Sequence, residues 1–489
     1  MDATLVATLT MPPGDGLEAE LTDVAWLEVR ADLVGDLAPE SLRTRFPGKL
    51  LYTLRSRAEG GGWEGSPERR KRRLLDAAGR FDLVDLEANR DLSPDLLRSI
   101  PPERRVISWH GPATNLAGLK NVFEKMSAVD ALLYKMVPTA SQSGEEIPAL
   151  LLLDILKRRD VAVFCAGATG AWTRLVAPRL GAPVVYGAMG DVPGAPGQIP
   201  LRRLREDFGL PALPPVQRLF GVVGNPVAHS LSPRLHNTAY RELGIPALYL
   251  PFHVESFGDF WLEVVESGAL EQIGMPLQGL SITTPHKESA LAVSAAPSPR
   301  AELVGAVNTL VSNEGVWEGE TTDPEGVVLP LRARGVDLPS RRAAVVGAGG
   351  AGRAAAEGLV VAGAQVTLVN RDAERGQQAA TLLKLPFIPL EDFQPAAFDL
   401  IVNSTSLGRQ ADDPLPFAVD GLAPETLVVD LVYKEEPTPL LRAARERGLA
   451  TIDGREVLIH QALGQFRWMT GRDMPLATAL RIVGLEGRR

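Results

Sequence analysis

Short apolar runs alternate with longer amphipathic stretches over the first 210 residues of the chain. KLLYTLR at 49–55 is typical of the runs, and SPERRKRRLLDAAGR at 66–80 is typical of the stretches. The runs predict buried strands, the stretches predict helices, and their alternation predicts parallel pairing. At least seven repeats favour a (β/α)8 barrel over an open sheet. Strands are expected within residues 25–34, 49–55, 81–88, 104–110, 131–137, 161–167 and 183–189.

The alternation is interrupted by PALPPVQ at residues 211–217. Three prolines in seven residues cannot continue a helix or a central strand, so this segment is predicted to be a linker. The strand–helix pattern then resumes, most clearly at AAVVGAGGAGRAAAEGLVVAGAQVTLVNR, residues 343–371.

Length and composition limit the possible classes of protein. The chain has 489 residues, which suggests about three domains. A net charge of -9 argues against a general binder of nucleic acid or anionic membranes. The single cysteine, Cys165, allows no internal disulfide or cysteine-based metal cluster, and we expect no metal site. Without a secretory signal or a long apolar run, the expected location is cytoplasmic.

Charged and polar residues stand near the ends of the predicted barrel strands, where they would converge at one mouth. Lys135 lies in the apolar run ALLYKMV. An unpaired buried lysine is costly, and burial favours the neutral amine that a Schiff base requires. The full set comprises Glu28, Arg30, Arg55, Glu87, His110, Lys135, Arg174 and Gln198.

The order and spacing of LEVRADL, LYTLR, EGG, DLVDLEA, VISWH, LLYKM, GAWTR and APGQ make residues 1 to about 210 resemble type I 3-dehydroquinate dehydratase. The resemblance implies that Lys135 forms an imine with the substrate ketone. His110 would remove a proton from the neighbouring carbon and return one to the departing hydroxyl. The resemblance further implies that Glu87 orients His110, that Arg174 and Gln198 hold the substrate carboxylate, and that Glu28, Arg30 and Arg55 hold hydroxyls and one another.

In the second half, GAGGAG at 347–352 follows an apolar run and opens an alanine-rich helix. This context makes it a dinucleotide-binding fingerprint. Gly347 would allow the tight turn, Gly349 the approach of a phosphate and Gly352 close helix packing. The pyrophosphate would lie at the helix start, and the loop is completed by Ala348, Gly350 and Ala351.

The next predicted strand ends in VTLVNRD. Asn370 and Arg371 stand where an NAD site usually has an acid, and a cation there favours the 2′-phosphate of NADP(H). Arg353 and Arg375 could add positive charge or could be surface arginines. The acidic Asp372, which follows Arg371 directly, weakens the argument for NADP(H) a little.

Upstream, Ser230 and Ser232 in HSLSP lie on one side if the segment is extended, and two such hydroxyls can hold a carboxylate. A turn with a helix cap is the alternative. Lys287 ends SITTPHK and Asp323 lies in GETTDPEG, so the two are candidates for an acid–base pair. Spacing alone fits an unrelated surface pair as well.

NPVAHSLSP, PHK, GAVNT, TTD, VGAGGAGRAA, NSTSLG and DGREVLIHQALGQFRWMTG make the chain from about 218 to its end resemble shikimate dehydrogenase. The resemblance implies that Lys287 is the catalytic lysine and that Ser230 and Ser232 bind the substrate carboxylate. Thr283, Asn308, Asp323 and Gln461 would bind ring hydroxyls, with help from Tyr433. Asn403, Thr405 and Ser406 would border the nicotinamide ribose. The chain departs from the family pattern at Ser281, Thr321, Asp372 and Lys434.

Together the resemblances predict an α/β chain with a (β/α)8 barrel at 1–210, a linker at 211–217, a substrate domain at 218–323, a Rossmann NADP domain at 324–457 and C-terminal helices at 458–489 that return to the substrate domain. They imply a bifunctional enzyme that dehydrates 3-dehydroquinate and then reduces 3-dehydroshikimate to shikimate with NADPH. Its expected partners are these small molecules, without nucleic acid or membrane, and the oligomeric state stays open. The alternatives are a catabolic quinate/shikimate dehydrogenase that uses NAD and a non-catalytic metabolite sensor.

Overall fold

A computed structural model describes residues 2–14, 16–434 and 436–486. The chain divides into two compact units. The first contains the chain up to Gly221 together with Pro226–Leu277, and the second contains Val222–Asn225 and the chain from Gln278 onward. The predicted domain boundaries stay predictions.

The first eight strands form one sheet in the order β7-β6-β5-β4-β3-β2-β1-β8, with parallel neighbours, which wraps into a nearly closed barrel. The predicted α/β class and barrel are confirmed. The first strand lies outside the seven predicted runs. The strands are β1 (Thr4–Leu9), β2 (Trp26–Arg30), β3 (Lys49–Thr53), β4 (Leu83–Glu87), β5 (Arg105–Pro112), β6 (Leu133–Thr139), β7 (Val161–Val163) and β8 (Val184–Ala188).

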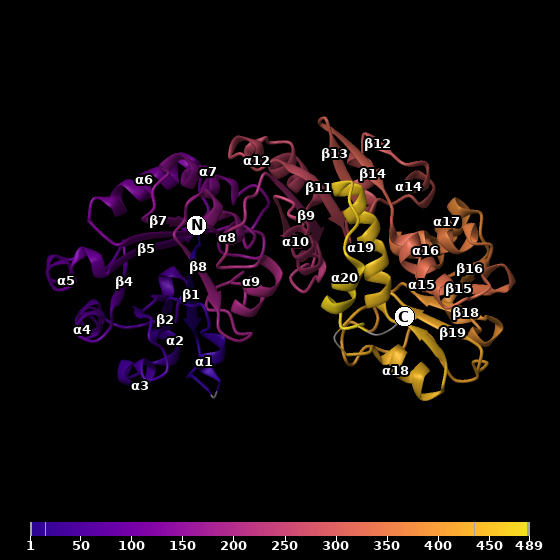
Figure 1. Ribbon diagram of the computed structural model, residues 1–489, viewed down its shortest axis with the longest axis horizontal. Helices are drawn as coiled ribbons and strands as arrows, with labels where there is room; N and C mark the ends of the chain where they lie inside the picture. The colour runs from indigo at the N-terminus through magenta and orange to yellow at the C-terminus, as the bar shows by residue number, and fades with distance from the viewer. Residues whose placement is uncertain (1, 15, 435, 487–489) are drawn as a thin grey trace. The chain divides into compact units, whose positions relative to one another are not determined.

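Helices separate the strands along the chain and cover the outside of the barrel (Figure 1). The long helix α4 begins with proline after Ser66, whose side chain accepts a hydrogen bond from the amide of Arg69 and so caps the helix. The helices are α1 (Leu17–Glu20), α2 (Ala31–Val34), α3 (Pro39–Arg43), α4 (Pro67–Ala78), α5 (Pro94–Ser99), α6 (Leu116–Ser127), α7 (Ile147–Leu156), α8 (Thr173–Val176) and α9 (Leu201–Phe208), with short 3-10 turns η1 (Arg57–Glu59), η2 (Pro102–Arg104) and η3 (Ala177–Leu180).

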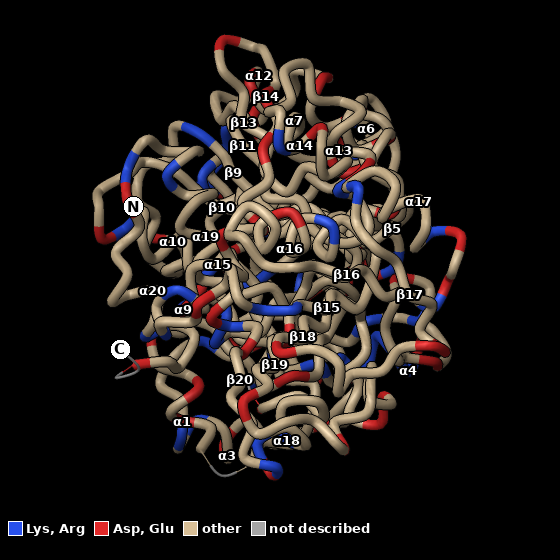
Figure 2. The backbone as a smooth tube through the Cα atoms, turned by 90° about the vertical axis from the view of Figure 1, so that its right-hand side faces the viewer, with Lys and Arg blue, Asp and Glu red and all other residues tan. Residues whose placement is uncertain are grey.

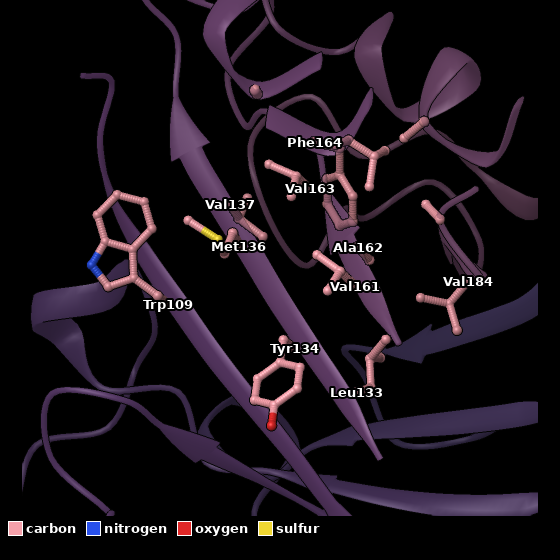
Figure 3. Packing of buried hydrophobic residues seen from close by; sticks show 14 of the residues in the cluster. Trp109, Leu133, Tyr134, Met136, Val137, Val161, Ala162, Val163, Phe164 and Val184 are labelled. Carbon is pink, nitrogen blue, oxygen red and sulfur yellow. The ribbon is translucent and has the colours of Figure 1, made fainter. Parts of the chain in front are cut away.

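Apolar side chains of β5, β6 and β7 pack into one buried cluster (Figure 3). Both faces of these strands are buried because one faces the barrel interior and the other the helices. This packing holds the polar strand residues in place, Lys135 among them.

A second sheet has six strands in the order β10-β9-β11-β13-β14-β12. In this sheet β11 pairs antiparallel with β13, and β13 pairs antiparallel with β14. The strands are β9 (Arg218–Gly224), β10 (Ala247–His253), β11 (Leu277–Ile282), β12 (Ala296–Pro297), β13 (Thr309–Asn313) and β14 (Val316–Glu320), and the helices are α10 (Ser232–Leu243), α11 (Phe257–Phe260), η4 (Trp261–Val265), α12 (Ala269–Gln272), α13 (Lys287–Val293) and α14 (Pro299–Val304).

A third sheet is parallel, in the order β17-β16-β15-β18-β19-β20. This is the strand order of a doubly wound nucleotide-binding fold. All strands run the same way, but the order in which the chain adds them changes from one side of β15 to the other, where β18 begins the second half. The strands are β15 (Arg342–Val346), β16 (Gln365–Asn370), β17 (Phe387–Pro389), β18 (Leu400–Asn403), β19 (Leu427–Asp430) and β20 (Ala450–Ile452), and the helices are α15 (Asp323–Ala333), α16 (Gly350–Val361), α17 (Ala373–Leu383), α18 (Pro439–Glu446), α19 (Gly454–Thr470) and α20 (Leu476–Ile482), with 3-10 turns η5 (Leu338–Ser340), η6 (Leu390–Asp392) and η7 (Pro395–Ala397).

Acidic and basic residues are interspersed along the backbone (Figure 2). Within the described ranges, no helix has the length and apolarity needed to cross a membrane.

Candidate active sites

The barrel encloses a polar pocket. Its lining brings together most of the predicted strand-end residues, because the side chains of parallel barrel strands converge on one mouth. The pocket is lined by Thr8, Glu28, Arg30, Thr53, Arg55, His110, Lys135, Val137, Phe164, Arg174, Tyr186, Gly194, Ala195 and Gln198. Glu87 is the one predicted barrel residue that does not line it.

Lys135 lines this pocket and is only 5% exposed. Its Nζ lies 3.5 Å from Glu28 Oε1 and 3.7 Å from Asp85 Oδ2, and it stands 4.3 Å from the centroid of the Tyr186 ring. The amine is therefore buried, as predicted, and in addition it is paired with two carboxylates.

Glu28 is held as a carboxylate. Burial alone would raise its pKa, but the charges of Lys135, Arg30 and Arg55 bring the pKa of Glu28 down to about 2. Its two oxygens accept hydrogen bonds from Thr8 (2.8 Å) and Thr53 (2.9 Å). The orientation of this carboxylate is thereby set from both neighbouring strands.

Glu59, rather than Glu87, contacts His110. Oε2 of Glu59 lies 3.2 Å from His110 Nδ1 and accepts the His110 backbone N–H at 3.0 Å. Glu87 accepts from the amide and hydroxyl of Ser56, both at 2.7 Å. The prediction that Glu87 orients His110 is therefore wrong, because Glu87 faces the chain that follows β3. The turn η1 after that segment carries Glu59 to His110.

The two groups have opposite pKa shifts. Burial, followed by the charges of Arg55 and Lys135, lowers the pKa of His110 well below its ordinary value. Burial, with Glu87 and Asp85 nearby, raises the pKa of Glu59 to about 7. An ionised Glu59 holds a proton on Nδ1 of His110, which leaves Nε2 as a proton acceptor. The pair is suited to proton transfer near neutral pH.

Arg174 is the cation of the pocket that lacks a carboxylate partner among the described residues. It is 5% exposed, its Nε has no hydrogen-bond partner, and its guanidinium lies 4.5 Å from the Phe164 ring centroid. Burial lowers its pKa to about 10, which leaves it charged at neutral pH. A buried, unpaired guanidinium favours an anionic ligand.

Gln198 and Arg30 hold the chain segment at the pocket mouth. Gln198 donates to Thr8 Oγ1 (2.9 Å) and accepts from the amide of Gly194 (2.8 Å). Arg30 pairs with Asp32 at 2.8 Å and donates to the Gly194 carbonyl. These two predicted ligands thus also order the loop that lines the pocket.

Several residues in or next to the pocket were not predicted from the sequence. Asp85 lies two positions before Glu87 on β4, and it accepts from Arg55 (2.9 Å) and Ser108 (2.6 Å). The alternation of side chains along a strand places both acids on one face, so DLVDLEA contained this signal. EGG likewise contained Glu59, whereas Tyr186 gave no signal within its apolar run.

In the second unit, Lys287 and Asp323 form an ion pair, as predicted. Asp323 is the first residue of α15, and Lys287 is the first residue of α13. Asn308 donates to the other Asp323 oxygen at 2.7 Å. Three predicted residues, far apart in sequence, are thus joined by hydrogen bonds.

Helix α19 approaches these residues through two glutamines. The backbone carbonyl of Gln461 accepts from Thr322 Oγ1 at 3.1 Å. Gln465, which was not predicted, donates to the Asn308 carbonyl and accepts from Ser281 Oγ, both at 3.0 Å. Ser281, one of the departures, is thereby integrated into the site. Thr283 comes directly after β11, and Tyr433 lies in the coil after β19. The roles of both residues stay predictions.

Ser230 and Ser232 lie in the first unit, around the start of α10. Ser230 Oγ accepts from the amide of Ser232 at 3.2 Å, so the turn left open as an alternative is present. Their action as a carboxylate site stays a prediction.

The glycine loop joins β15 to α16. Gly347 has φ 112°, in the region that favours glycine, and a Cβ on Gly352 would lie 2.1 Å from the Gly347 carbonyl oxygen. A Cβ on Gly349 would have no atom within 4 Å. Gly349 is therefore the glycine next to open space at the start of α16, which fits the approach of a phosphate.

Some of the residues at the end of β16 and after it stabilise the local fold, and others present a positive charge to solvent. Asn370 accepts from the Ala348 amide at 3.2 Å, and Asp372 caps α17 by accepting from the amide of Arg375 at 3.0 Å. Arg371 and Arg375 are exposed. Arg353 is buried and donates to the carbonyls of Val304, Gly305 and Ala348, so it is neither a surface arginine nor free for a phosphate.

Asn403 is fully buried, and its amide donates to Asp430 at 2.9 Å while its oxygen accepts from Thr405 Oγ1 at 2.7 Å. Its side chain shapes the loop after β18, and Ser406 of that loop is exposed. Contact of Asn403, Thr405 and Ser406 with a ribose stays a prediction.

Comparisons with known proteins match the two halves of the chain to two different enzyme families. Residues 7–210 match the type I 3-dehydroquinase family. Residues 222–310 match the shikimate dehydrogenase substrate binding domain, residues 331–410 match shikimate / quinate 5-dehydrogenase, and residues 454–483 match the shikimate 5′-dehydrogenase C-terminal domain.

Similar proteins cover one half or both halves of the chain. A shikimate dehydrogenase (NADP(+)) from Acidiphilium cryptum is 45% identical over 251 residues, 51% of this chain and 89% of that protein. A chloroplastic bifunctional 3-dehydroquinate dehydratase/shikimate dehydrogenase from Arabidopsis thaliana is 29% identical over 92% of this chain and 78% of its own length. The crystal structure of shikimate dehydrogenase from Aquifex aeolicus covers 55% of this chain and 97% of its own, with 33% identity and a TM-score of 0.51. Both resemblances found in the sequence are confirmed.

Proposed function

Because the chain belongs to the shikimate dehydrogenase family and carries a type I 3-dehydroquinase segment ahead of it, we propose that it converts 3-dehydroquinate to shikimate in two consecutive steps. The single observation that supports this most strongly is that each half holds one lysine among acid–base partners. Lys135 lies near His110 in the barrel pocket, and Lys287 is paired with Asp323.

In the first step, Lys135 attacks the substrate ketone and forms an imine with loss of water. The imine withdraws electrons and makes the neighbouring C–H acidic. His110, held by Glu59, takes that proton and passes one to the departing hydroxyl, which leaves as water. Hydrolysis of the imine frees 3-dehydroshikimate and restores the amine. Arg174 pairs with the substrate carboxylate.

In the second step, Lys287 donates a proton to the ketone oxygen of 3-dehydroshikimate, and Asp323 holds the ammonium in position. Asn308 fixes the other oxygen of Asp323 and so sets its direction. Ser230 and Ser232 bind the carboxylate, and Thr283, Gln461 and Tyr433 contact ring hydroxyls. A bound reduced nicotinamide cofactor supplies the hydride.

The residues present fit NADP(H). The open space at Gly349 and the helix start behind it would take the pyrophosphate. The exposed Arg371, with Arg375, would take the 2′-phosphate, because a guanidinium binds phosphate through paired hydrogen bonds. An enzyme that turns over better with NAD would instead match the catabolic alternative.

A coupled assay tests the proposal. The wild type and the variants Lys135→Ala and Lys287→Ala receive 3-dehydroquinate and NADPH, and shikimate and 3-dehydroshikimate are quantified. Lys135→Ala should still reduce added 3-dehydroshikimate, and Lys287→Ala should accumulate it. Lys135→Arg is the matched control, since it keeps the charge but forms no imine, and it should be equally inactive in dehydration. Full overall flux in either alanine variant would refute the role of that lysine.

A further inference from the structure

The last barrel helix, α9, lies between two predicted substrate-binding segments within one compact unit. Gln198, at the barrel pocket, precedes the helix by three residues. Ser230 lies in the loop that precedes α10, and this loop contacts α9 through Arg203. The helix has eight residues, so it is short enough to act as one rigid element.

Arg203 of α9 supports that loop directly. Its NH1 donates to the carbonyl of Ala228, and its NH2 donates to the carbonyl of Ser230 at 3.4 Å. The loop consists of turns and bends, so its carbonyls are not held by a strand or helix. A guanidinium presents several donors in a fixed plane, which suits it to hold two such carbonyls at once.

The position of Arg203 is itself fixed. Asp207, which is 1% exposed, accepts from Arg203 Nε at one oxygen and from Arg234 Nε of α10 at the other, both at 2.7 Å. Arg234 also pairs with Glu206 at 2.6 Å. One buried carboxylate thus joins the barrel helix to the helix that begins at the predicted carboxylate site.

A second contact joins the same parts of the unit. The ring of Trp172, two residues before Arg174, meets the ring of Phe252 on β10 edge-on, with centroids 5.2 Å apart. Both side chains are almost fully buried. The contact between the barrel and residues 226–277 is therefore an apolar, packed one as well as a network of ion pairs.

We propose that Arg203 is a positioning residue of the dehydrogenase: a barrel side chain holds the loop that presents the Ser230 hydroxyl to the carboxylate of the substrate. The proposal rests on the proposed role of Ser230. A hydroxyl on a loop binds well only when the loop is held in the binding geometry. The affinity of the dehydrogenase for its substrate therefore depends on the dehydratase barrel.

Steady-state kinetics of Arg203→Ala and Arg203→Lys in the full chain test this. We expect KM for shikimate to rise about tenfold, with kcat changed less than about twofold, because the loss lies in substrate binding. Arg203→Lys keeps a charge facing Asp207 but cannot hold both carbonyls, so it should resemble Arg203→Ala. A purely structural ion pair predicts full rescue by lysine. Arg202→Ala, at an exposed position of the same helix, is the matched control and should be unchanged.

Dehydratase turnover in the same samples reports folding of the barrel and should be unchanged. A wild-type KM in Arg203→Ala or Arg203→Lys overturns the proposal, as does a parallel loss of both activities. Ser230→Ala separates the proposed substrate contact of Ser230 from the proposed positioning role of Arg203. If its KM rises while that of Arg203→Ala does not, only the positioning role fails. If its KM is unchanged, the proposed role of Ser230 fails and the role of Arg203 fails with it.

Discussion

At the scale of single residues, the chemistry of the barrel depends on how charges are paired in a buried pocket. Lys135 lies between two carboxylates, His110 is bonded to Glu59, and Arg174 has no carboxylate partner in the described chain. Their places near strand ends made Lys135, His110 and Arg174 candidates, and the family resemblance gave them roles. Neither predicted Glu59, because its contact with His110 arises from the turn η1 and not from a strand.

Glu59→Gln tests the proposed pairing of Glu59 with His110. Since the pKa of Glu59 is about 7, the carboxylate is ionised above that pH and protonated below it. Wild-type dehydration should therefore fall as the pH drops below about 7. In Glu59→Gln this acid limb should move to lower pH, where only His110 titrates, and kcat should fall about tenfold to hundredfold.

The exposed Glu64→Gln, from the same segment, is the control. An unchanged acid limb in Glu59→Gln would show that another group governs the profile.

Arg371→Ala tests the cofactor preference at the same scale. Hydrogen bonds to a charged group contribute about 1.5–3 kcal/mol, so KM for NADPH should rise roughly tenfold to hundredfold. KM for NADH, which lacks the 2′-phosphate, should stay within about twofold. Equal changes for both cofactors would contradict the assignment, and Arg342→Ala, at an exposed arginine of β15, is the control.

At the scale of elements, one glycine of the glycine loop is needed for packing, and another leaves space for a ligand. Gly352 lies against the Gly347 carbonyl, whereas Gly349 faces open space. The GAGGAG pattern, set between a strand and a helix, predicted these roles because they follow from local geometry. The exact use of Asn370, Asp372 and Arg353 was not predictable, since each depends on which backbone groups lie nearby in three dimensions.

A matched pair of substitutions separates the two roles. Gly352→Ala places a methyl group on a backbone oxygen, and such overpacking costs about 1–3 kcal/mol. The melting temperature should fall by roughly 2–4 °C per kcal/mol. Gly349→Ala should melt like the wild type and raise KM for NADPH about tenfold. Thermal melts and initial rates check both, and a stability loss in Gly349→Ala alone would reverse the assignment.

At the scale of the whole molecule, one chain carries two proposed catalytic sites, one for each step of the bifunctional activity. Lys135 belongs to the first compact unit and Lys287 to the second. The two lysines lie in different units and act in different proposed steps, so the loss of one lysine should leave the other reaction intact.

Mixing Lys135→Ala with Lys287→Ala tests this independence. The second variant releases 3-dehydroshikimate, and the first reduces it, so the mixture should form shikimate from 3-dehydroquinate after a lag. The lag should shorten as protein concentration rises. The absence of shikimate from a mixture in which each variant retains its own reaction would contradict independent sites.

The sequence by itself determined the barrel and nucleotide-binding folds and the glycine loop, and its resemblance to two families singled out the two lysines. The folds and the loop follow from periodicity and from residues adjacent along the chain, where local geometry sets the outcome. Only the tertiary structure decided that Glu59 rather than Glu87 holds His110, that Gln465 supports Asn308 and that Arg203 reaches the Ser230 loop. Those contacts join side chains from separate elements, and their direction depends on how the strands and helices pack.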